Sequence, residues 1–139
     1  MIANDLEISK LMTADIFTLN ESDTVDIAEE VMGWRTIRHI PIVDDDQRLV
    51  GLLTHRDILK CSISMIAGIS KETQRKLNHV IKIKEVMNTE PRSIPQNTLV
   101  RDAAKILVEN KFGCLPIVDG EKLVGIVTEA DFVKAFIKD

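Results

Sequence analysis

The chain contains the same pattern of residues twice, and the second copy begins about 75 residues after the first. The first copy holds Met12, Val25, Ala28, Pro41–Asp44, Leu49–Gly51, Thr54, Asp57 and Lys60, and the second holds Met87, Val100, Ala103, Pro116–Asp119, Leu123–Gly125, Thr128, Asp131 and Lys134. A solenoid needs several repeats to bury its core, so two copies of this length favour another architecture. We expect a pseudo-twofold pair whose copies pack face to face, with the functional site where they meet.

Composition excludes several classes of function. The 139 residues carry a net charge of −4 and no long run of Lys or Arg, which argues against nucleic-acid binding. The apolar runs are too short to span a membrane, and the N-terminus does not resemble a signal peptide. Cys61 and Cys114 occupy unrelated positions in the two copies, so we expect a reducing, cytoplasmic location. The histidines and cysteines show no metal-ligand spacing, and no metal is expected.

Each copy predicts the order strand, helix, strand, strand, helix. In the first copy we expect an extended segment at 17–19, a helix capped by Ser22 or Asp23 that breaks near Gly33, strands at 40–43 and 48–54, and a helix to about Cys61. Its apolar face consists of Val25, Ile27, Ala28, Val31 and Met32. In the second copy the corresponding elements are 92–94, a helix capped by Asn97 or Thr98, a hairpin of 115–118 and 122–128, and a helix at 131–137.

These elements place the chain in the α+β class. The first repeat spans 8–62 and the second 83–139, with a polar connector at 63–82 in which the segment 71–77 has helical character. A three-stranded sheet with two helices on one side leaves its other face uncovered, so the two repeats are expected to pack sheet to sheet.

The strongest local motif is Gly-x-x-Thr-x-x-Asp, which occurs at 51–57 and again at 125–131. Thr54 and Asp57 in the first copy, and Thr128 and Asp131 in the second, stand where a strand ends and a helix begins. A capping box is one interpretation, although Asp is shorter than the Glu or Gln that usually closes it. Glycine inside a strand also indicates the close approach of another backbone or of a ligand.

The alternative interpretation is a nucleoside site. One ionised Asp can accept hydrogen bonds from two adjacent ribose hydroxyls, and a helix N-terminus favours a phosphate. Arg38, His39 and Arg56 are the candidate cations, although a solvated strand start explains them equally well. The second copy has Gly113, Cys114 and Ala130 at these positions, which predicts one strong site at Asp57 and one weak site.

The duplicated order of helix, Pro-Ile-Val-Asp, hairpin and Gly-x-x-Thr-x-x-Asp resembles the tandem CBS domain, named for cystathionine β-synthase and paired as a Bateman module. The resemblance covers residues from about Ile8 to Phe136 apart from the connector. It implies a stand-alone, non-catalytic module that binds AMP, ADP, ATP or S-adenosylmethionine in clefts between the repeats, and it implies no separate cofactor. It also implies a homodimer and an unidentified regulated protein.

The resemblance assigns candidate ligand residues to two clefts. Asp57 and Thr54 would hold one ribose, with Arg38, His39 and Arg56 facing phosphates, and with Thr98 and Ala103 contributed by the second repeat. The second cleft would centre on Asp131 and Thr128, with backbone near Cys114 and Leu115, and Asp23 stands where the first cleft has Thr98. Thr18, Ile40 and Ser93 complete the set of candidates, and Thr18 and Ser93 could equally serve strand backbone. For Ala103, close helix packing is the competing interpretation.

Two other functions stay open. The chain could be a structural dimerisation module that has lost its ligand, or a small enzyme that hydrolyses the nucleotide. No trio of residues fits a nucleophile, a base and an orienting acid, so we expect no catalysis.

Overall fold

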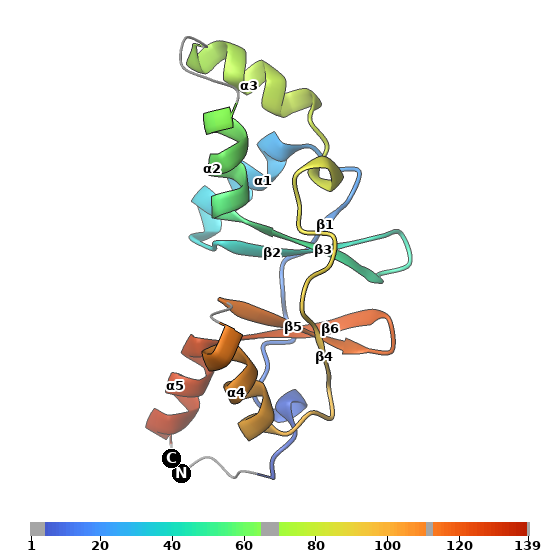
Figure 1. Ribbon diagram of the computed structural model, residues 1–139, viewed down its shortest axis with the longest axis vertical. Coiled ribbons are helices and arrows are strands. Elements are labelled where there is room, and N and C mark those ends of the chain that lie inside the picture. The colour runs from blue at the N-terminus through green and yellow to red at the C-terminus, as the bar shows by residue number, and fades with distance from the viewer. Residues whose placement is uncertain (1–4, 65–69, 111–112, 139) are drawn as a thin grey trace. The chain divides into compact units, whose positions relative to one another are not determined.

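The computed structural model describes residues 5–64, 70–110 and 113–138, and the chain divides into two compact units (Figure 1). One unit is Phe17–Pro91, here called the first-repeat unit. The other combines Met1–Ile16 with Arg92–Asp139 and is called the second-repeat unit. Within the described residues, no helix is both long enough and apolar enough to cross a membrane.

The first-repeat unit is a three-stranded sheet in the order β1-β2-β3, with α1 and α2 on the same face (Figure 1). Its elements are β1 (Leu19–Asn20), α1 (Val25–Arg35), β2 (His39–Val43), β3 (Leu49–Thr54), α2 (His55–Ser64), α3 (Lys71–Val80) and the 3-10 helix η2 (Ile83–Glu85). β1 pairs with β2 in parallel, and β2 pairs with β3 antiparallel. The predicted helical segment of the connector is confirmed as α3, which packs against α1.

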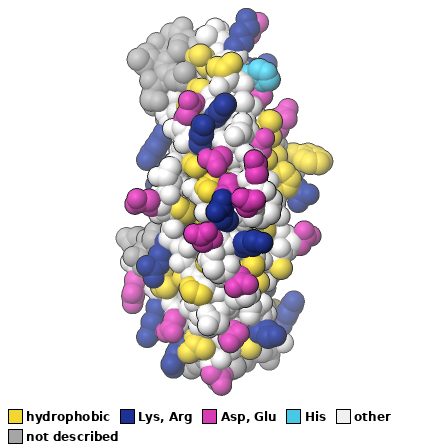
Figure 2. All heavy atoms as spheres, turned by 90° about the vertical axis from the view of Figure 1, so that its right-hand side faces the viewer, with side chains coloured by type: hydrophobic (Ala, Val, Ile, Leu, Met, Phe, Trp, Pro, Cys, Tyr) yellow, Lys and Arg dark blue, Asp and Glu magenta, His cyan; other side chains and the backbone are white. Residues whose placement is uncertain are grey.

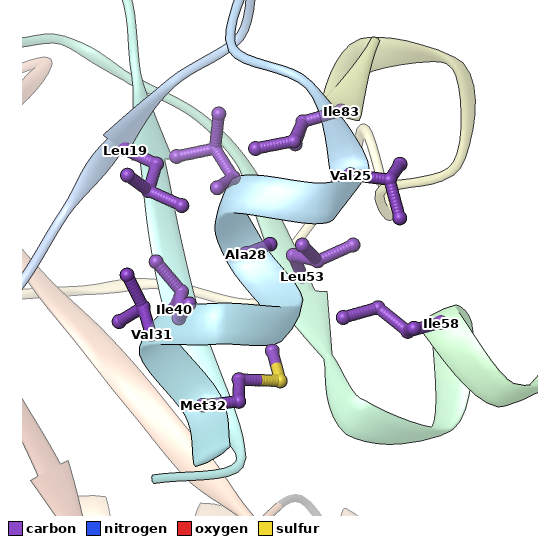
Figure 3. Packing of buried hydrophobic residues seen from close by; sticks show 10 residues of the cluster. Leu19, Val25, Ala28, Val31, Met32, Ile40, Leu53, Ile58 and Ile83 are labelled. Carbon is purple, nitrogen blue, oxygen red and sulfur yellow. The ribbon is translucent and has the colours of Figure 1, made fainter. Parts of the chain in front are cut away.

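The core of this unit forms where α1 covers the sheet. Val25, Ala28, Val31 and Met32 of α1 are buried because they recur at the spacing of one helix face. Figure 3 shows them beside Ile40 of β2, Leu53 of β3 and Ile58 of α2. Ile27 is 39% exposed, so its predicted place on the buried face is wrong.

The second-repeat unit repeats this arrangement, with a sheet in the order β4-β5-β6. Its elements are the 3-10 helix η1 (Ile8–Lys10), β4 (Ile94–Pro95), α4 (Val100–Asn110), β5 (Cys114–Asp119), β6 (Lys122–Thr128) and α5 (Glu129–Lys138). Val100, Ala103 and Leu107 of α4 are buried against Leu115, Ile117 and Val127. The predicted α+β class, with one such sheet from each repeat, is confirmed.

Each unit is completed by a segment that, in the sequence, directly precedes the strands and helices of the other repeat. Ile8 is fully buried in the core of the second-repeat unit, and Ile83 is fully buried in the core of the first-repeat unit. Thr13 pairs with Ile126 beside β6, and Asn88 pairs with Leu52 beside β3. The sequence pattern did not predict this exchange.

Both predicted boundaries of α1 are wrong. α1 does not break at Gly33 but continues to Arg35, where Thr36 takes the left-handed conformation with φ 58°. The N-cap of α1 is Thr24 rather than Ser22 or Asp23. Asp23 instead accepts a hydrogen bond of 2.8 Å from the backbone N–H of Asn20 and so closes the preceding turn.

Candidate functional site

Asp57 and Thr54 form a reciprocal pair at the start of α2. The backbone N–H of Thr54 donates to Oδ2 of Asp57 at 2.8 Å, and the backbone N–H of Asp57 donates to Oγ1 of Thr54 at 3.1 Å. This is the geometry of a capping box, so the capping interpretation is confirmed for Asp57 although its side chain is shorter than that of Glu or Gln. The pair uses one carboxylate oxygen of Asp57, and no described residue donates a hydrogen bond to the other, Oδ1.

His39 lies beside this pair because strand pairing places it there. The register of β2 and β3 sets His39 opposite Thr54, and α2 begins at the next residue. Burial, reinforced by the positive charge of Arg38, lowers the pKa of His39, while the Asp57 carboxylate acts in the opposite direction. Because His39 pairs with Thr54 and Asp57 caps Thr54, an imidazole and a carboxylate lie at the same edge of the sheet.

The two other candidate cations flank the same edge. Arg38 is exposed, and its carbonyl oxygen accepts from the backbone N–H of His55 at 2.9 Å, which ties the start of β2 to the start of α2. Arg56 is exposed in the first turn of α2. The first-repeat unit therefore brings together Arg38, His39, Thr54, Arg56 and Asp57.

Asp131 of the second-repeat unit has a different set of neighbours. Its Oδ2 accepts from the backbone N–H of Thr128 at 2.8 Å and from the Thr128 hydroxyl at 3.4 Å. Its Oδ1 accepts from the hydroxyl of Thr13 at 3.1 Å. Both oxygens of Asp131 thus have protein donors.

The cations of the first site have no counterparts in the second. Cys114 pairs with Thr128 across the sheet, as His39 pairs with Thr54, but Cys114 is buried and uncharged. Burial raises the pKa of the Cys114 thiol to about 12, so the thiol stays protonated at neutral pH. Gly113 and Ala130 also lack charge.

Three further candidates lie within the cores of their own units. Ile40, Ala103 and Leu115 are each 0% exposed, so their side chains pack in the core and do not face a ligand. The burial of Ala103 against its own sheet is what close helix packing predicts.

The remaining candidates lie near the short strands. Thr18 and Ser93 are half-buried and precede β1 and β4 by one residue. Thr98 is half-buried ahead of α4, and its carbonyl oxygen accepts from the backbone N–H of Ile8 at 2.7 Å. Thr98 and Ala103 belong to a different unit from Asp57, and their contribution to a shared site stays a prediction.

Sequence reasoning missed Thr13. The signal was present, because Met12 and Met87 match in the repeat while the residues that follow them, Thr13 and Asn88, differ. The duplication thus marks position 13 as one where the two copies are not equivalent.

A separate hollow of about 690 Å³ lies between α1 and α3. Its lining includes Asp26, Glu29 and Glu30 from α1 and Arg75, Lys76 and His79 from α3. None of the predicted ligand residues lines it. Figure 2 likewise shows acidic and basic side chains side by side over the visible face.

The chain matches the model of the CBS domain at residues 8–64 and 83–138. A CBS domain-containing protein of Dictyostelium discoideum is 30% identical over 132 residues, which cover 94% of this chain and 91% of the relative. CBSX1, a chloroplastic protein of Arabidopsis thaliana, is 31% identical over 144 residues, covering 89% of this chain but 60% of CBSX1. The relative MJ1404 of Methanocaldococcus jannaschii is 32% identical, and the match spans only 32% of its length.

Solved structures share the fold. The crystal structure of CBSX2 in complex with AMP has a TM-score of 0.80 and 27% identity, and the match covers 95% of this chain and 96% of that one. A CBS domain pair of MJ0100, in complex with 5′-methylthioadenosine and S-adenosylmethionine, has a TM-score of 0.76 and 23% identity over 94% of this chain and 99% of that one. The predicted tandem pair is confirmed, and such pairs are regulatory modules rather than enzymes.

Proposed function

This chain belongs to the CBS domain family, and from that membership we propose that it binds an adenosyl ligand at Asp57 and signals the occupancy to a partner protein. The AMP complex of CBSX2 and the 5′-methylthioadenosine and S-adenosylmethionine complex of MJ0100 support the ligand class. The identity of the ligand among AMP, ADP, ATP and S-adenosylmethionine is part of the proposal, as is the regulated protein. The cytoplasmic location stays a prediction of the sequence.

This proposal rests on the different roles of the two carboxylate oxygens of Asp57. Oδ2 caps α2, while no hydrogen bond from a described residue reaches Oδ1. An ionised carboxylate oxygen that is partly exposed and has no protein donor can accept from a ribose hydroxyl. The cap fixes the carboxylate, so little side-chain freedom is lost on binding.

The charges around Asp57 favour a phosphorylated ligand. Arg38 and Arg56 are exposed cations, and a phosphate near His39 would favour its charged form against the effect of burial. With a diol contact, a few phosphate contacts and a partly buried base, we expect a Kd of about 1–50 µM.

Asp57→Asn tests the proposal while keeping the cap. Asn retains a side-chain oxygen that can accept from the backbone N–H of Thr54 but loses the charge that favours a diol. We expect the melting temperature to change little and the affinity for AMP, measured by calorimetry, to fall about tenfold or more. Asp102→Asn, an exposed change on α4, is the matched control and should leave both quantities unchanged. AMP affinity that survives Asp57→Asn unchanged would contradict the proposal.

A dimerisation module is the second candidate, and the surface of α5 favours it. Val133, Phe136 and Ile137 are 57%, 70% and 74% exposed and fall on one stripe of the helix. Apolar side chains in such a row are suited to a second copy of the chain. Phe136→Glu should convert a dimer to a monomer in sedimentation experiments, whereas Lys134→Glu, a change beside the stripe, should not. A wild-type chain that sediments as a monomer would contradict this assignment.

A further inference from the structure

The two copies of the motif differ in what contacts the outward oxygen of the aspartate. Thr13 exchanges two backbone hydrogen bonds with Ile126, the residue after Gly125, at 2.9 and 3.0 Å. Asn88 makes the same exchange with Leu52, the residue after Gly51, at 3.0 Å in both directions. Thr13 and Asn88 therefore hold equivalent backbone positions, one in each unit.

Their side chains act differently. The hydroxyl of Thr13 donates to Oδ1 of Asp131 at 3.1 Å. The side-chain oxygen of Asn88 accepts from the backbone N–H of Glu90 at 3.0 Å, which holds it within its own turn. The same backbone geometry thus brings a hydroxyl to one aspartate and none to the other.

We propose that Thr13 is a specificity-determining residue, a built-in hydroxyl that takes the place of a ribose hydroxyl on Asp131 and weakens the second site. The inference rests on the proposed ribose-binding role of the motif aspartates. A threonine hydroxyl and a ribose hydroxyl are the same kind of donor to a carboxylate, so a ligand at Asp131 competes with the Thr13 hydroxyl for Oδ1. The weak second site then follows from occupation of the carboxylate as well as from the absence of cations at Gly113, Cys114 and Ala130.

The expected effect is moderate. The hydrogen bond from Thr13 lies at an exposed position, so water can replace it when the hydroxyl is removed. A net hydrogen-bond contribution of this kind corresponds to a change in affinity of about three- to tenfold. Thr13→Val keeps the branched shape and the backbone pairing with Ile126 and removes only the donor.

The experiment uses the full chain with Asp57→Asn as background, so that binding reports the second site. Adenosine is the probe because Gly113, Cys114 and Ala130 stand where the first site has its cations, and its binding is followed by NMR up to millimolar concentration. Adding Thr13→Val should tighten adenosine binding about three- to tenfold, while Thr13→Ser, which keeps the hydroxyl, should leave it unchanged. Thr13→Val should not tighten the binding of 2′,3′-dideoxyadenosine, because this probe lacks the two ribose hydroxyls.

Two results would overturn the inference. One is unchanged, weaker or undetectable adenosine binding after Thr13→Val, and the other is an equal gain for the dideoxy probe, which would indicate a packing effect. The reciprocal change Asn88→Thr in the otherwise wild-type chain should weaken AMP binding at Asp57 by a similar factor. A wild-type chain that binds neither AMP nor adenosine would refute the proposed function itself, which separates that failure from a failure of the role of Thr13.

Discussion

A methionine and a carbonyl oxygen leave no room for a side chain at Gly51. A Cβ atom there would lie 2.3 Å from Sδ of Met87 and 3.0 Å from the carbonyl oxygen of Asn88. At Gly125, Sδ of Met12 and the carbonyl oxygen of Thr13 would lie at 2.5 and 3.0 Å. The glycine of the motif thus leaves room for a neighbouring segment of the protein. The expectation that another backbone comes close to this glycine is confirmed, and no ligand is needed to explain the glycine.

Gly51→Ala should therefore destabilise the first-repeat unit by about 1–3 kcal/mol, because the thioether of Met87 has to move and the backbone of Asn88 cannot do so freely. Gly33→Ala is the matched control. It lies inside α1 with nothing within 4 Å of the added Cβ, so it should stabilise the chain by about 0.5–1 kcal/mol. Urea denaturation measures both changes. Equal effects of the two substitutions would refute the steric explanation.

His39 gives the stability of the first-repeat unit a pH dependence. Its pKa in the folded chain is lowered from the ordinary 6.5, chiefly by burial, so the unfolded chain binds the proton more readily. The free energy of unfolding should therefore decrease as the pH falls below about 7. His39→Gln should reduce this slope, and His55→Gln, at an exposed position, should preserve it. Chemical denaturation between pH 5 and pH 8 tests the difference, and a slope unaffected by His39→Gln would contradict it.

Polar contacts attach α3 to α1. Asn78 of α3 is 4% exposed and donates to the Glu29 carboxylate, while its side-chain oxygen accepts from Nε2 of Gln74 at 2.8 Å. Nδ1 of His79 lies 2.8 Å from Oδ2 of Asp26 at the exposed side of the same contact. The connector is thus attached to the first-repeat unit through a helix pair.

Asn78→Ala should loosen this attachment. Burial raises the pKa of Glu29, and the hydrogen bond from the Asn78 amide opposes that effect. Loss of the amide should therefore lower the free energy of unfolding by about 1–3 kcal/mol. His79→Ala removes an exposed pair and should cost less than about 1 kcal/mol. Hydrogen exchange of the α3 amides is the measurement. If the order of the two effects is reversed, the exposed pair rather than Asn78 attaches the helix.

Periodicity predicted the helices and strands because each has one buried face, as Val25, Ala28, Val31 and Met32 show on α1. The motif offered a capping box and a ligand carboxylate as alternatives for Asp57, and it could not say which oxygen caps the helix, since that depends on the rotamer of one side chain. It also missed the contact between Thr13 and Asp131, because residues 118 apart in sequence meet only through folding. The matched Met12–Gly125 and Met87–Gly51 contacts were encoded in the repeat, but the sequence alone does not say which methionine meets which glycine.

The exchange of first segments makes each unit depend on a segment that lies outside its own sequence repeat. Residues 8–64 match the family model as one repeat, yet the compact unit is Phe17–Pro91. Ile83 lies beyond that first repeat and is 0% exposed within the unit, and Ile8 has the same place in the second-repeat unit. Neither sequence repeat contains the whole core of its own sheet.

Ile8→Ala should therefore destabilise the second-repeat unit, and Ile83→Ala should destabilise the first-repeat unit. Truncating a fully buried isoleucine costs about 2–5 kcal/mol. Ile8→Ala should accelerate hydrogen exchange mainly in α4, β5 and β6, and Ile83→Ala mainly in α1, β2 and β3. Ile27→Ala, at a position that is 39% exposed, is the control and should change exchange little. Faster exchange after Ile8→Ala confined to α1, β2 and β3 would show that each repeat folds with its own first segment. Faster exchange in α4, β5 and β6 would instead show that each unit is completed by a segment covalently joined to the other repeat. The two repeats would then be stable only as a pair.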